Sequence, residues 1–410
     1  MARVHVTSEI GPLRAVVVHT PGPELLAVTP GNREEYLYDD IIDLELAQRE
    51  HRQFVAVLER FAQVYEVRAL LSELVARPDV REFLVTRALE VVPSDALAKK
   101  LAELSADALV AVMVEGALEE AGPIARALNE SGFALPALPN LFFTRDVGIV
   151  IGEHSIIGSM RYGVRWTEEL LIKALFRYHP YLENAGILYD GSEEKRFTHT
   201  LEGGDVHPVR PDLLVLGFSE RSSPAALDHL CDLVFEHCGV KDVIVVVLPS
   251  ERTAIHLDMI LTQLDRELCC VYPPHFVGAE RLAVLHRRKK SKGVREMPNF
   301  FAAMQAVDHP LEPVFCGGNS RTLQEREQWS SACNFFAVRP GAVITYARNE
   351  ATLRELEHAG FKSVAAVNLL TGEDAFAEHE RAVITLEGSE LVRGGGGPRC
   401  MTLPLRRDDL

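Results

Sequence analysis

Short apolar runs rich in β-branched residues recur along most of the chain, and this recurrence most constrains the fold. Runs of this kind are typical of strands buried on both faces of a sheet. They fall at residues 15–19, 148–151, 213–217, 243–248, 342–346 and 382–386. Helical periodicity separates several of them, as along residues 43–62, where Leu44, His51, Phe54 and Leu58 share one face. The alternation predicts an α/β fold.

Residues 70–132 differ from the rest of the chain. They are rich in Ala, Leu and Glu, have almost no strand-like runs, and are punctuated by Pro78, Pro93 and Pro123. This composition predicts a helical insert. Because no long linker follows it, residues 1–69 and 133–410 are predicted to share one core as a discontinuous catalytic domain.

The composition, 47% hydrophobic and 25% charged, is that of a folded chain. No apolar stretch approaches the roughly 18 residues of a membrane span, and the N-terminus lacks a signal core, so we expect a cytoplasmic protein. A net charge of −16 disfavours nonspecific nucleic-acid binding, and the basic run at 286–292 is expected to be solvated. The seven cysteines have no CxxC pairs, which predicts reduced thiols.

Four consecutive glycines at residues 394–397 precede Pro398, Arg399 and Cys400. Glycine allows positive φ and a close approach of the backbone to a ligand, at a cost in chain entropy. A tight loop is therefore expected to present Cys400, as a nucleophile would be presented. This segment alone also fits a glycine-rich turn beside a buried, inert cysteine.

Three further segments carry polar residues that could serve the same site. Glu202 and Asp205 flank two glycines, which would let both carboxylates turn into one pocket, although an exposed acidic turn also fits. His256 and Asp258 would face the same side of a strand. Asp146 ends a segment that a capped turn would also explain. Combined with a cysteine, such residues supply a nucleophile, a proton shuttle and a complement to a cationic carbon centre.

Taken in order, these segments strongly resemble the bacterial arginine deiminases of the guanidino-group-modifying superfamily. The resemblance rests on Asn140, Phe143-Thr144-Arg145-Asp146, Glu202-Gly203-Gly204-Asp205-Val206, His256-Leu257-Asp258 and Gly397-Pro398-Arg399-Cys400-Met401. It extends to blocks at residues 8–13, 39–41, 326–329 and 348–349, and so covers nearly the whole chain.

The resemblance implies a five-bladed, pseudo-symmetric α/β propeller with a helical insert and an active site on the central axis. It implies hydrolysis of free L-arginine to L-citrulline and ammonia through a covalent thiouronium intermediate, without a cofactor or a metal. Cys400 then aligns with the nucleophile, His256 with the general acid and base, and Glu202 with the carboxylate that orients the histidine.

The resemblance also implies how the substrate is held. Its guanidinium group would lie between Asp146 and Asp258, since two carboxylates match its planar fork of donors. Its α-carboxylate would bind Asn140, Arg165 and Arg221. Asp205 would meet the substrate's α-amino end or support the catalytic residues.

One departure concerns the loop before the cysteine. The family commonly has Arg-Gly-Arg-Gly-Gly there, and this chain has Gly395 in place of the second arginine. An arginine at that position could stabilise the Cys400 thiolate and, in an empty site, occupy Asp146 and Asp258. With glycine we expect this carboxylate pair to be unoccupied and the thiolate to depend more on bound substrate.

Two other functions stay open on the sequence alone. An amidinotransferase of the same superfamily would use a similar Cys, His and Asp site to pass the amidino group to an amine. A non-catalytic homologue would bind arginine without turnover. In each case the partner is a small molecule, neither nucleic acid nor a membrane is expected, and a homo-oligomer is left open.

Overall fold

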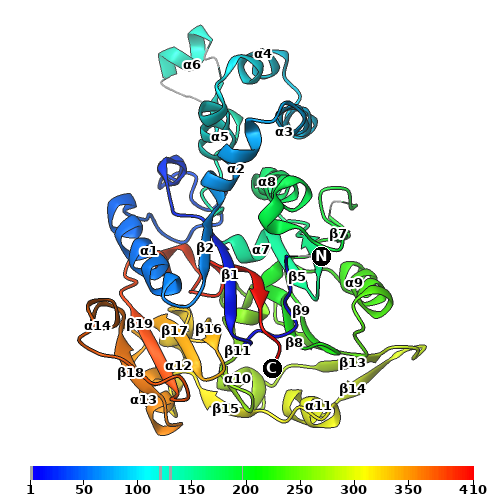
Figure 1. Cartoon of the computed structure of the whole chain (residues 1–410), viewed down its shortest axis with the longest axis vertical. Helices are drawn as coiled ribbons and strands as arrows, with labels where there is room; N and C mark the ends of the chain where they lie inside the picture. The colour runs from blue at the N-terminus through cyan, green and yellow to red at the C-terminus, as the bar shows by residue number, and fades with distance from the viewer. Residues whose placement is uncertain (1–2, 120–121, 129–131, 196) are drawn as a thin grey trace.

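The computed structural model describes residues 3–119, 122–128, 132–195 and 197–410, and it is a mixed α/β structure (Figure 1). All six expected strands are present. They are β1 (Leu13–Val18), β5 (Gly148–Ile151), β9 (Leu213–Phe218), β10 (Asp242–Val247), β17 (Ala342–Tyr346) and β19 (Ala382–Leu386). The expected helix is α1 (Leu44–Glu59), which begins where the Asp43 side chain accepts a hydrogen bond from the Leu46 N–H at 2.8 Å.

One strand pattern recurs in five sheets of the described residues. Two strands pair antiparallel, and a connection containing at least one helix leads from the second of them to a strand that lies parallel to it. In one sheet the antiparallel pair consists of the last strand of the chain and the first. The remaining strands of these sheets are β2 (Gln63–Glu66), β6 (His154–Ile157), β7 (Ile187–Asp190), β8 (Val206–Arg210), β11 (Leu261–Gln263), β12 (Leu268–Val271), β13 (Val284–Arg288), β14 (Val294–Met297), β15 (Glu312–Phe315), β16 (Phe336–Arg339), β18 (Lys362–Ala365) and β20 (Leu403–Arg407).

Several helices in these connections lie at the periphery of the molecule in Figure 1. They are α8 (Trp166–Tyr178), α9 (Pro224–His237), α11 (Phe300–Ala306), α13 (Glu350–His358) and α14 (Ala366–Thr371). Two further helices of this part of the chain are α10 (Pro273–Phe276) and α12 (Arg321–Trp329), of which α12 joins β15 to the next sheet. The two ends of the chain share one sheet, because β20 pairs antiparallel with β1. The glycine loop directly before β20 therefore lies among residues from distant parts of the chain, against Phe143 and Asn334.

A tight turn stands directly before the first strand of each antiparallel pair, and these turns carry or adjoin the residues predicted to be catalytic. They include α7 (Thr144–Val147) before β5, η4 (Gly203–Asp205) before β8, η6 (Leu257–Met259) before β11, and the turn at 398–401 before β20. The expectation that His256 and Asp258 lie in a strand is wrong. The backbone turns here because Leu257 N–H donates to Asp205 Oδ1 at 2.9 Å, and β11 begins only at Leu261.

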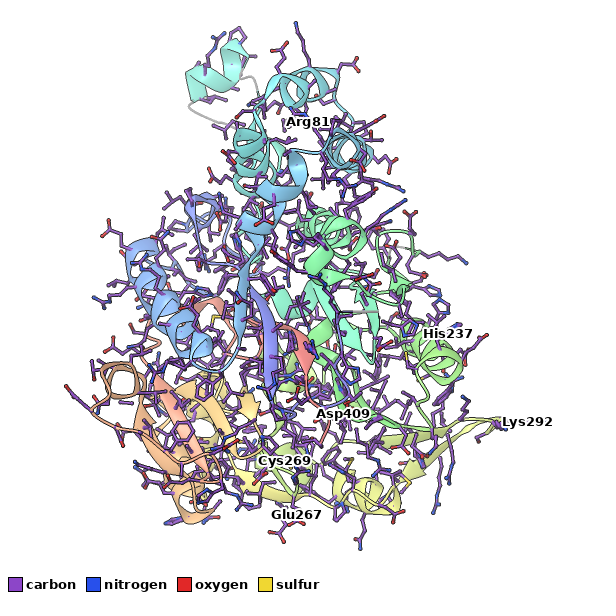
Figure 2. The ribbon with its side chains drawn as sticks, in the orientation of Figure 1. Arg81, His237, Glu267, Cys269, Lys292 and Asp409 are labelled. Atoms are coloured by element: carbon purple, nitrogen blue, oxygen red, sulfur yellow. The ribbon has the colours of Figure 1, made fainter. Side chains whose placement is uncertain are left out.

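Helices dominate the segment that was expected to be helical, and they stand at the top of Figure 1. They are α2 (Val67–Val75), α3 (Pro78–Val91), α4 (Asp95–Glu103), α5 (Ala106–Glu115) and α6 (Pro123–Leu128). A short strand pair, β3 (Ala117–Leu118) and β4 (Phe133–Leu135), was not predicted. Arg81 ties α3 to the end of α4 by donating to the carbonyls of Leu101 and Leu104 at 2.9 and 2.6 Å (Figure 2).

The basic run at 286–292 belongs to the β13–β14 hairpin. Figure 2 labels Lys292 at its tip, far from the centre of the molecule. Within the run, Arg287 pairs with Asp228 at 3.1 Å and with Asp232. Among the described residues, no helix is both long enough and apolar enough to cross a membrane.

Candidate active site

A small buried cavity, here called the inner cavity, lies where the turns before β5, β11 and β20 meet. Its walls include Asn140, Asp146, Arg165, Arg221, His256 and Cys400. The other predicted site residues, Glu202, Asp205 and Asp258, are buried directly behind these side chains. The cavity volume is about 30 Å³, which is enough to hold a water molecule. Arginine is much larger than one water, so we expect side chains to move when it binds.

His256 is held by Glu202, whose Oε2 lies 2.8 Å from Nε2 of the ring. The other ring nitrogen, Nδ1, faces Asp146 Oδ1 at 3.7 Å. A glycine at position 204 makes room for the ring, because a Cβ there would lie 2.5 Å from the His256 Cγ. The glycine pair in the acidic motif therefore allows the imidazole to pack on the backbone.

The electrostatics of this pair favour the imidazolium. Burial alone would lower the pKa of His256, but the charges of Asp146 and Glu202 outweigh burial and raise that pKa to about 9. Burial opposes ionisation of Glu202, yet Arg221 and the bond to His256 lower the pKa of its carboxyl to about 2. Near neutral pH the histidine is therefore a proton donor.

Cys400 reaches the inner cavity from the turn before β20 and is only 4% exposed. Its sulfur lies 3.6 Å from Asp258 Oδ2. Burial, followed by the charges of Asp258 and Asp146, raises the pKa of the Cys400 thiol well above its usual value. The substrate-free thiol is thus protonated near neutral pH, and a cation beside it would favour the thiolate.

Asp146 is occupied by an arginine of the chain itself. Arg165 Nη1 donates to Asp146 Oδ2 at 2.7 Å, and its Nε and Nη2 donate to Glu168 at 2.8 to 3.1 Å. All three side chains are buried. This arrangement mimics a guanidinium substrate in the carboxylate site.

Asp258 is occupied in the same way. Arg399 Nη1 donates to Asp258 Oδ2 at 2.7 Å, and Glu9 accepts from the same guanidinium at 3.0 and 3.2 Å. The expectation that Gly395 leaves the carboxylate pair unoccupied is therefore wrong. Two other arginines, Arg165 and Arg399, supply the guanidinium groups that a loop arginine was expected to bring.

Arg221 and Asn140 line the part of the cavity where the α-carboxylate of the substrate was expected to bind. Arg221 Nη1 lies 3.3 Å from Glu202 Oε2, and its guanidinium stacks 4.8 Å from the centre of the Tyr162 ring. Asn140 Nδ2 donates to the Tyr36 carbonyl at 2.8 Å. Both therefore have protein partners in the closed cavity.

Asp205 supports the site from behind and is not part of the cavity wall. One oxygen accepts the Leu257 N–H, and the other accepts the hydroxyls of Ser219 and Ser222, each at 2.6 Å. Burial outweighs the effects of His256 and of these hydroxyls, and it raises the pKa of Asp205 to about 6. Of the two contacts considered for Asp205, the geometry favours support of the His256 turn.

Gly395 stands at the boundary between the inner cavity and a larger outer cavity of about 470 Å³. Its φ of +83° suits glycine, and a Cβ there would lie 3.5 Å from Arg252 Nη2. Arg252 also borders both cavities and pairs with Asp39 at 3.0 Å. A guanidinium group therefore lies close to the position of the missing loop arginine.

Sequence reasoning missed four buried residues of this centre: Glu9, Glu168, Asn334 and Arg399. Asn334 contacts Cys400, with Nδ2 lying 3.1 Å from Sγ. Arg399 adjoins Cys400 in the sequence, which was the available signal for it. The signal for Glu9 was its place in the block at residues 8–13, which shares the family resemblance. Glu168 and Asn334 stand in segments that carry no local signal of a site.

One group of described residues could offer three ligand atoms to a metal ion. Oxygens of Asp146 and Glu202 and a nitrogen of His256 lie within 4.8 Å of one another. Arg165 and Arg221 already pair with these two carboxylates. A divalent cation would therefore have to compete with two buried guanidinium groups, whereas a proton on His256 fits the arrangement as it stands.

Comparison with known sequences matches most of the chain to one family. A family model described as arginine deiminase matches residues 34–407. An arginine deiminase of Rhodococcus erythropolis is 32% identical, with 99% of this chain and 98% of the relative aligned. One of Streptococcus gordonii is 30% identical, with 99% of each chain aligned.

Solved structures share the fold at lower sequence identity. SxtG, an amidinotransferase from Microseira wollei, has a TM-score of 0.55 and 16% identity, with 100% of this chain and 98% of that one covered. The N-terminal domain of ArgZ, an arginine dihydrolase in Cyanobacteria, has a TM-score of 0.53 and 14% identity, with 96% and 97% covered. At such identity these likenesses establish the mixed α/β fold alone.

Proposed function

This chain belongs to the arginine deiminase family, and we propose that its inner cavity hydrolyses free L-arginine to L-citrulline and ammonia. One observation carries the proposal: a thiol, an imidazole and the Asp146 carboxylate line one cavity, with Asp258 directly behind them, and both of these carboxylates already bind a guanidinium group. Such a set suits covalent attack on a guanidinium carbon.

Binding of substrate would activate the nucleophile. The guanidinium of arginine would replace that of Arg165 on Asp146 and bring a positive charge beside Cys400. A nearby cation favours the thiolate, so the thiol would lose its proton when substrate is bound. His256 would remain an imidazolium, consistent with its raised pKa of about 9.

In the first half-reaction the thiolate of Cys400 adds to the guanidinium carbon and forms a tetrahedral adduct. His256 gives its proton to one terminal nitrogen of the adduct, and the C–N bond breaks to release ammonia. The products are a covalent thiouronium and a neutral imidazole. Glu202 would keep the ring oriented throughout.

In the second half-reaction water enters where ammonia has left. Neutral His256 takes a proton from this water as the oxygen bonds to the thiouronium carbon. The new tetrahedral species then collapses: the C–S bond breaks, its electron pair returns to sulfur, and the hydroxyl proton leaves as the carbonyl of citrulline forms. That proton restores the Cys400 thiol after citrulline departs, so that the cycle consumes one water and ends with the thiol and the His256 imidazolium with which it began.

Free arginine, in preference to peptidyl arginine, is the proposed substrate. Arg165, Arg221 and Asn140 would bind its α-carboxylate, and each of them faces the cavity. Arg165 would leave Asp146 to do so while keeping its bonds to Glu168. Asp258 would share its charge between Arg399 and the substrate.

We infer a matching organisation of the whole chain. The five sheets would be the blades of a pseudo-symmetric propeller, since each repeats one strand pattern and each begins at a turn directed to the centre. Residues 70–132 would be a helical insert in a discontinuous catalytic domain formed by residues 1–69 and 133–410.

The proposal is tested by a citrulline assay with free arginine, run with and without an added acceptor amine. We expect citrulline and ammonia in equal amounts, whatever amine is present. Transfer of the amidino group to the amine would instead identify an amidinotransferase, and binding without product would identify an arginine-binding homologue.

Cys400→Ala is the matched control for this assay. It should abolish citrulline production and leave the circular dichroism spectrum unchanged, because it removes only the sulfur. Cys333→Ala, which alters a buried cysteine outside the cavity wall, should retain turnover. More than a few per cent of turnover in Cys400→Ala would rule out this cysteine as nucleophile.

A further inference from the structure

The repeated turn pattern points to one more residue of the centre. Each sheet begins after a turn that sends a polar side chain inward, and four of these turns carry residues already described: Asp146, Glu202, His256 with Asp258, and Cys400. The fifth turn precedes β16, and its polar residue is Asn334. We propose that Asn334 is a catalytic residue that donates a hydrogen bond to the Cys400 sulfur and stabilises its thiolate, a role that rests on the proposed function.

The orientation of the Asn334 amide is fixed by the backbone around it. Oδ1 lies 3.0 Å from the Arg399 nitrogen and 3.1 Å from the Cys400 nitrogen. A backbone N–H can only donate, so the atom facing both must be the amide oxygen. The other terminal atom is therefore the NH₂ group. The amide cannot flip without leaving two buried donors unsatisfied.

The NH₂ group has two acceptors and points at both. Nδ2 donates to Cys400 Sγ at 3.1 Å and to the Asp258 carbonyl at 3.2 Å. Asn334 is 0% exposed, so water does not compete for either bond. In such surroundings a hydrogen bond to a charged acceptor is stronger than in water.

This donor offsets two effects that disfavour a negative charge on the Cys400 sulfur, namely burial and a nearby carboxylate. The sulfur faces the Asp258 carboxylate at 3.6 Å and is buried. An amide N–H directed at the sulfur favours the thiolate over the thiol, because the thiolate is the stronger acceptor. Asn334 therefore acts on the reacting atom itself.

The same bond would serve both covalent steps. As the sulfur lone pair forms the S–C bond, charge leaves the sulfur and the hydrogen bond weakens. When the second tetrahedral species collapses, the S–C electron pair returns to sulfur and the bond is restored. Asn334 would thus assist the departure of the thiolate as well as its formation.

The test measures the pH dependence of Cys400 alkylation by iodoacetamide in the substrate-free enzyme, followed by mass spectrometry of the peptide that carries Cys400. Asn334→Asp keeps the shape and an oxygen for the two backbone donors, but loses the N–H and adds negative charge. We expect the alkylation midpoint to move up by at least one pH unit and kcat/KM for arginine to fall at least about tenfold.

Asn334→Ser separates the lost donor from the added charge, because serine is neutral and too short to reach both partners. We expect its midpoint to move up as well, by less than that of Asn334→Asp. Should the Asp variant fail to fold by circular dichroism, the Ser variant is measured in the same way. Asn184→Asp alters an asparagine outside the cavity wall, bonded to the Phe176 carbonyl of α8 and to its own loop; it controls for the substitution and should leave the midpoint unchanged.

An unchanged midpoint in a folded Asn334 variant would overturn the proposal, even if turnover fell, because a purely structural asparagine would not act on the thiol. The alkylation measurement does not depend on catalytic turnover. If the wild-type protein made no citrulline, the proposed function would fail, while the alkylation midpoint would still decide whether Asn334 acts on Cys400.

Discussion

Arg165 is the residue that the proposed mechanism requires to change partners when substrate binds. In the closed site its guanidinium bridges Asp146 and Glu168, all buried. When substrate takes over Asp146, Glu168 can remain the partner of Arg165. A buried arginine that changed partners without this second carboxylate would be costly, so Glu168 makes the exchange feasible.

Arg165→Lys tests the carboxylate role. Lysine keeps a positive charge beside Glu168 but lacks the planar fork of donors. We expect kcat/KM for free arginine to fall about ten- to a hundredfold, the size expected for one hydrogen bond to a charged group. Arginine amide should be a poor substrate of the wild-type enzyme and change little in the variant. Equal losses for both substrates would contradict the assignment, and thermal denaturation checks that the variant is folded.

Gly395→Arg tests how the loop acts on Cys400. The new guanidinium would extend from a boundary shared by both cavities, close to Arg252 and to Cys400. A cation there should stabilise the free thiolate, so the pH profile of kcat/KM should shift towards acid while that of kcat changes much less. Gly395→Ala controls for the strain of a side chain at φ +83°. Parallel shifts of both profiles would show that the position does not reach Cys400.

The site residues divide sharply in how far the sequence could predict them. The predicted site residues stand beside glycines, other polar residues or Cys400. Such clusters of polar residues indicate a functional site, because burying polar side chains is costly unless they are paired. Asn334 stands alone between Cys333 and Phe335, in a segment that looks like a turn before a strand. Its contact with Cys400 joins segments far apart in the sequence, so only the fold reveals it.

At the scale of single elements, strands were predicted more accurately than turns. The six apolar runs became strands because β-branched residues fit a pleated, buried surface wherever the sheets lie. The segment around His256 resembled a strand locally, but a tertiary bond from Leu257 to Asp205 turns its backbone. Periodicity cannot report a bond between residues so distant in the chain.

Asp205→Asn tests the coupling between these two turns. Asparagine can still accept the Leu257 N–H, but it lacks the charge that helps to raise the pKa of His256 to about 9. The pKa of the free enzyme's imidazolium should therefore fall, and the alkaline limb of kcat/KM should move to lower pH. The two enzymes should converge on the acid side, because the wild-type carboxyl, with its pKa raised to about 6, is itself protonated there.

Asp205→Ala provides the comparison for this prediction. It removes the acceptor of the Leu257 N–H together with the charge, so the turn should lose its anchor and kcat should fall further than in Asp205→Asn. A pH profile of Asp205→Asn identical to that of the wild type would mean that the carboxylate only shapes the turn.

At the scale of the whole molecule, buried histidines link the fold to pH. His19 is buried beside Glu24 at 2.9 Å; burial opposes its charge, but Glu24 and Glu66 raise its pKa to about 9. His51 on α1 is also buried, and neither of its ring nitrogens has a hydrogen-bond partner among the residues that the structure describes. Burial, with the charge of His19, lowers the pKa of His51 to about 3. The two histidines therefore act on stability in opposite pH ranges.

The sign of each contribution follows from proton linkage. His19 holds its proton more tightly when folded, so its contribution is complete below pH 6.5 and is lost as pH rises towards 9. His51 stays neutral when folded, whereas the unfolded chain protonates it below about 6.5. Its contribution is complete above that pH and is lost as pH falls towards 3.

His51→Leu should therefore make the protein less sensitive to acid. Leucine fills a similar buried volume beside Phe54 and takes up no proton on unfolding. Between pH 6 and pH 4, the free energy of unfolding should rise relative to that of the wild type by about 1.4 kcal/mol for each pH unit of acidification. Urea titrations at several pH values measure this difference directly, with His358→Leu on the exposed end of α13 as the control for losing a histidine. A difference between His51→Leu and wild type that does not change with pH would show that His51 binds its proton equally in the folded and unfolded chains.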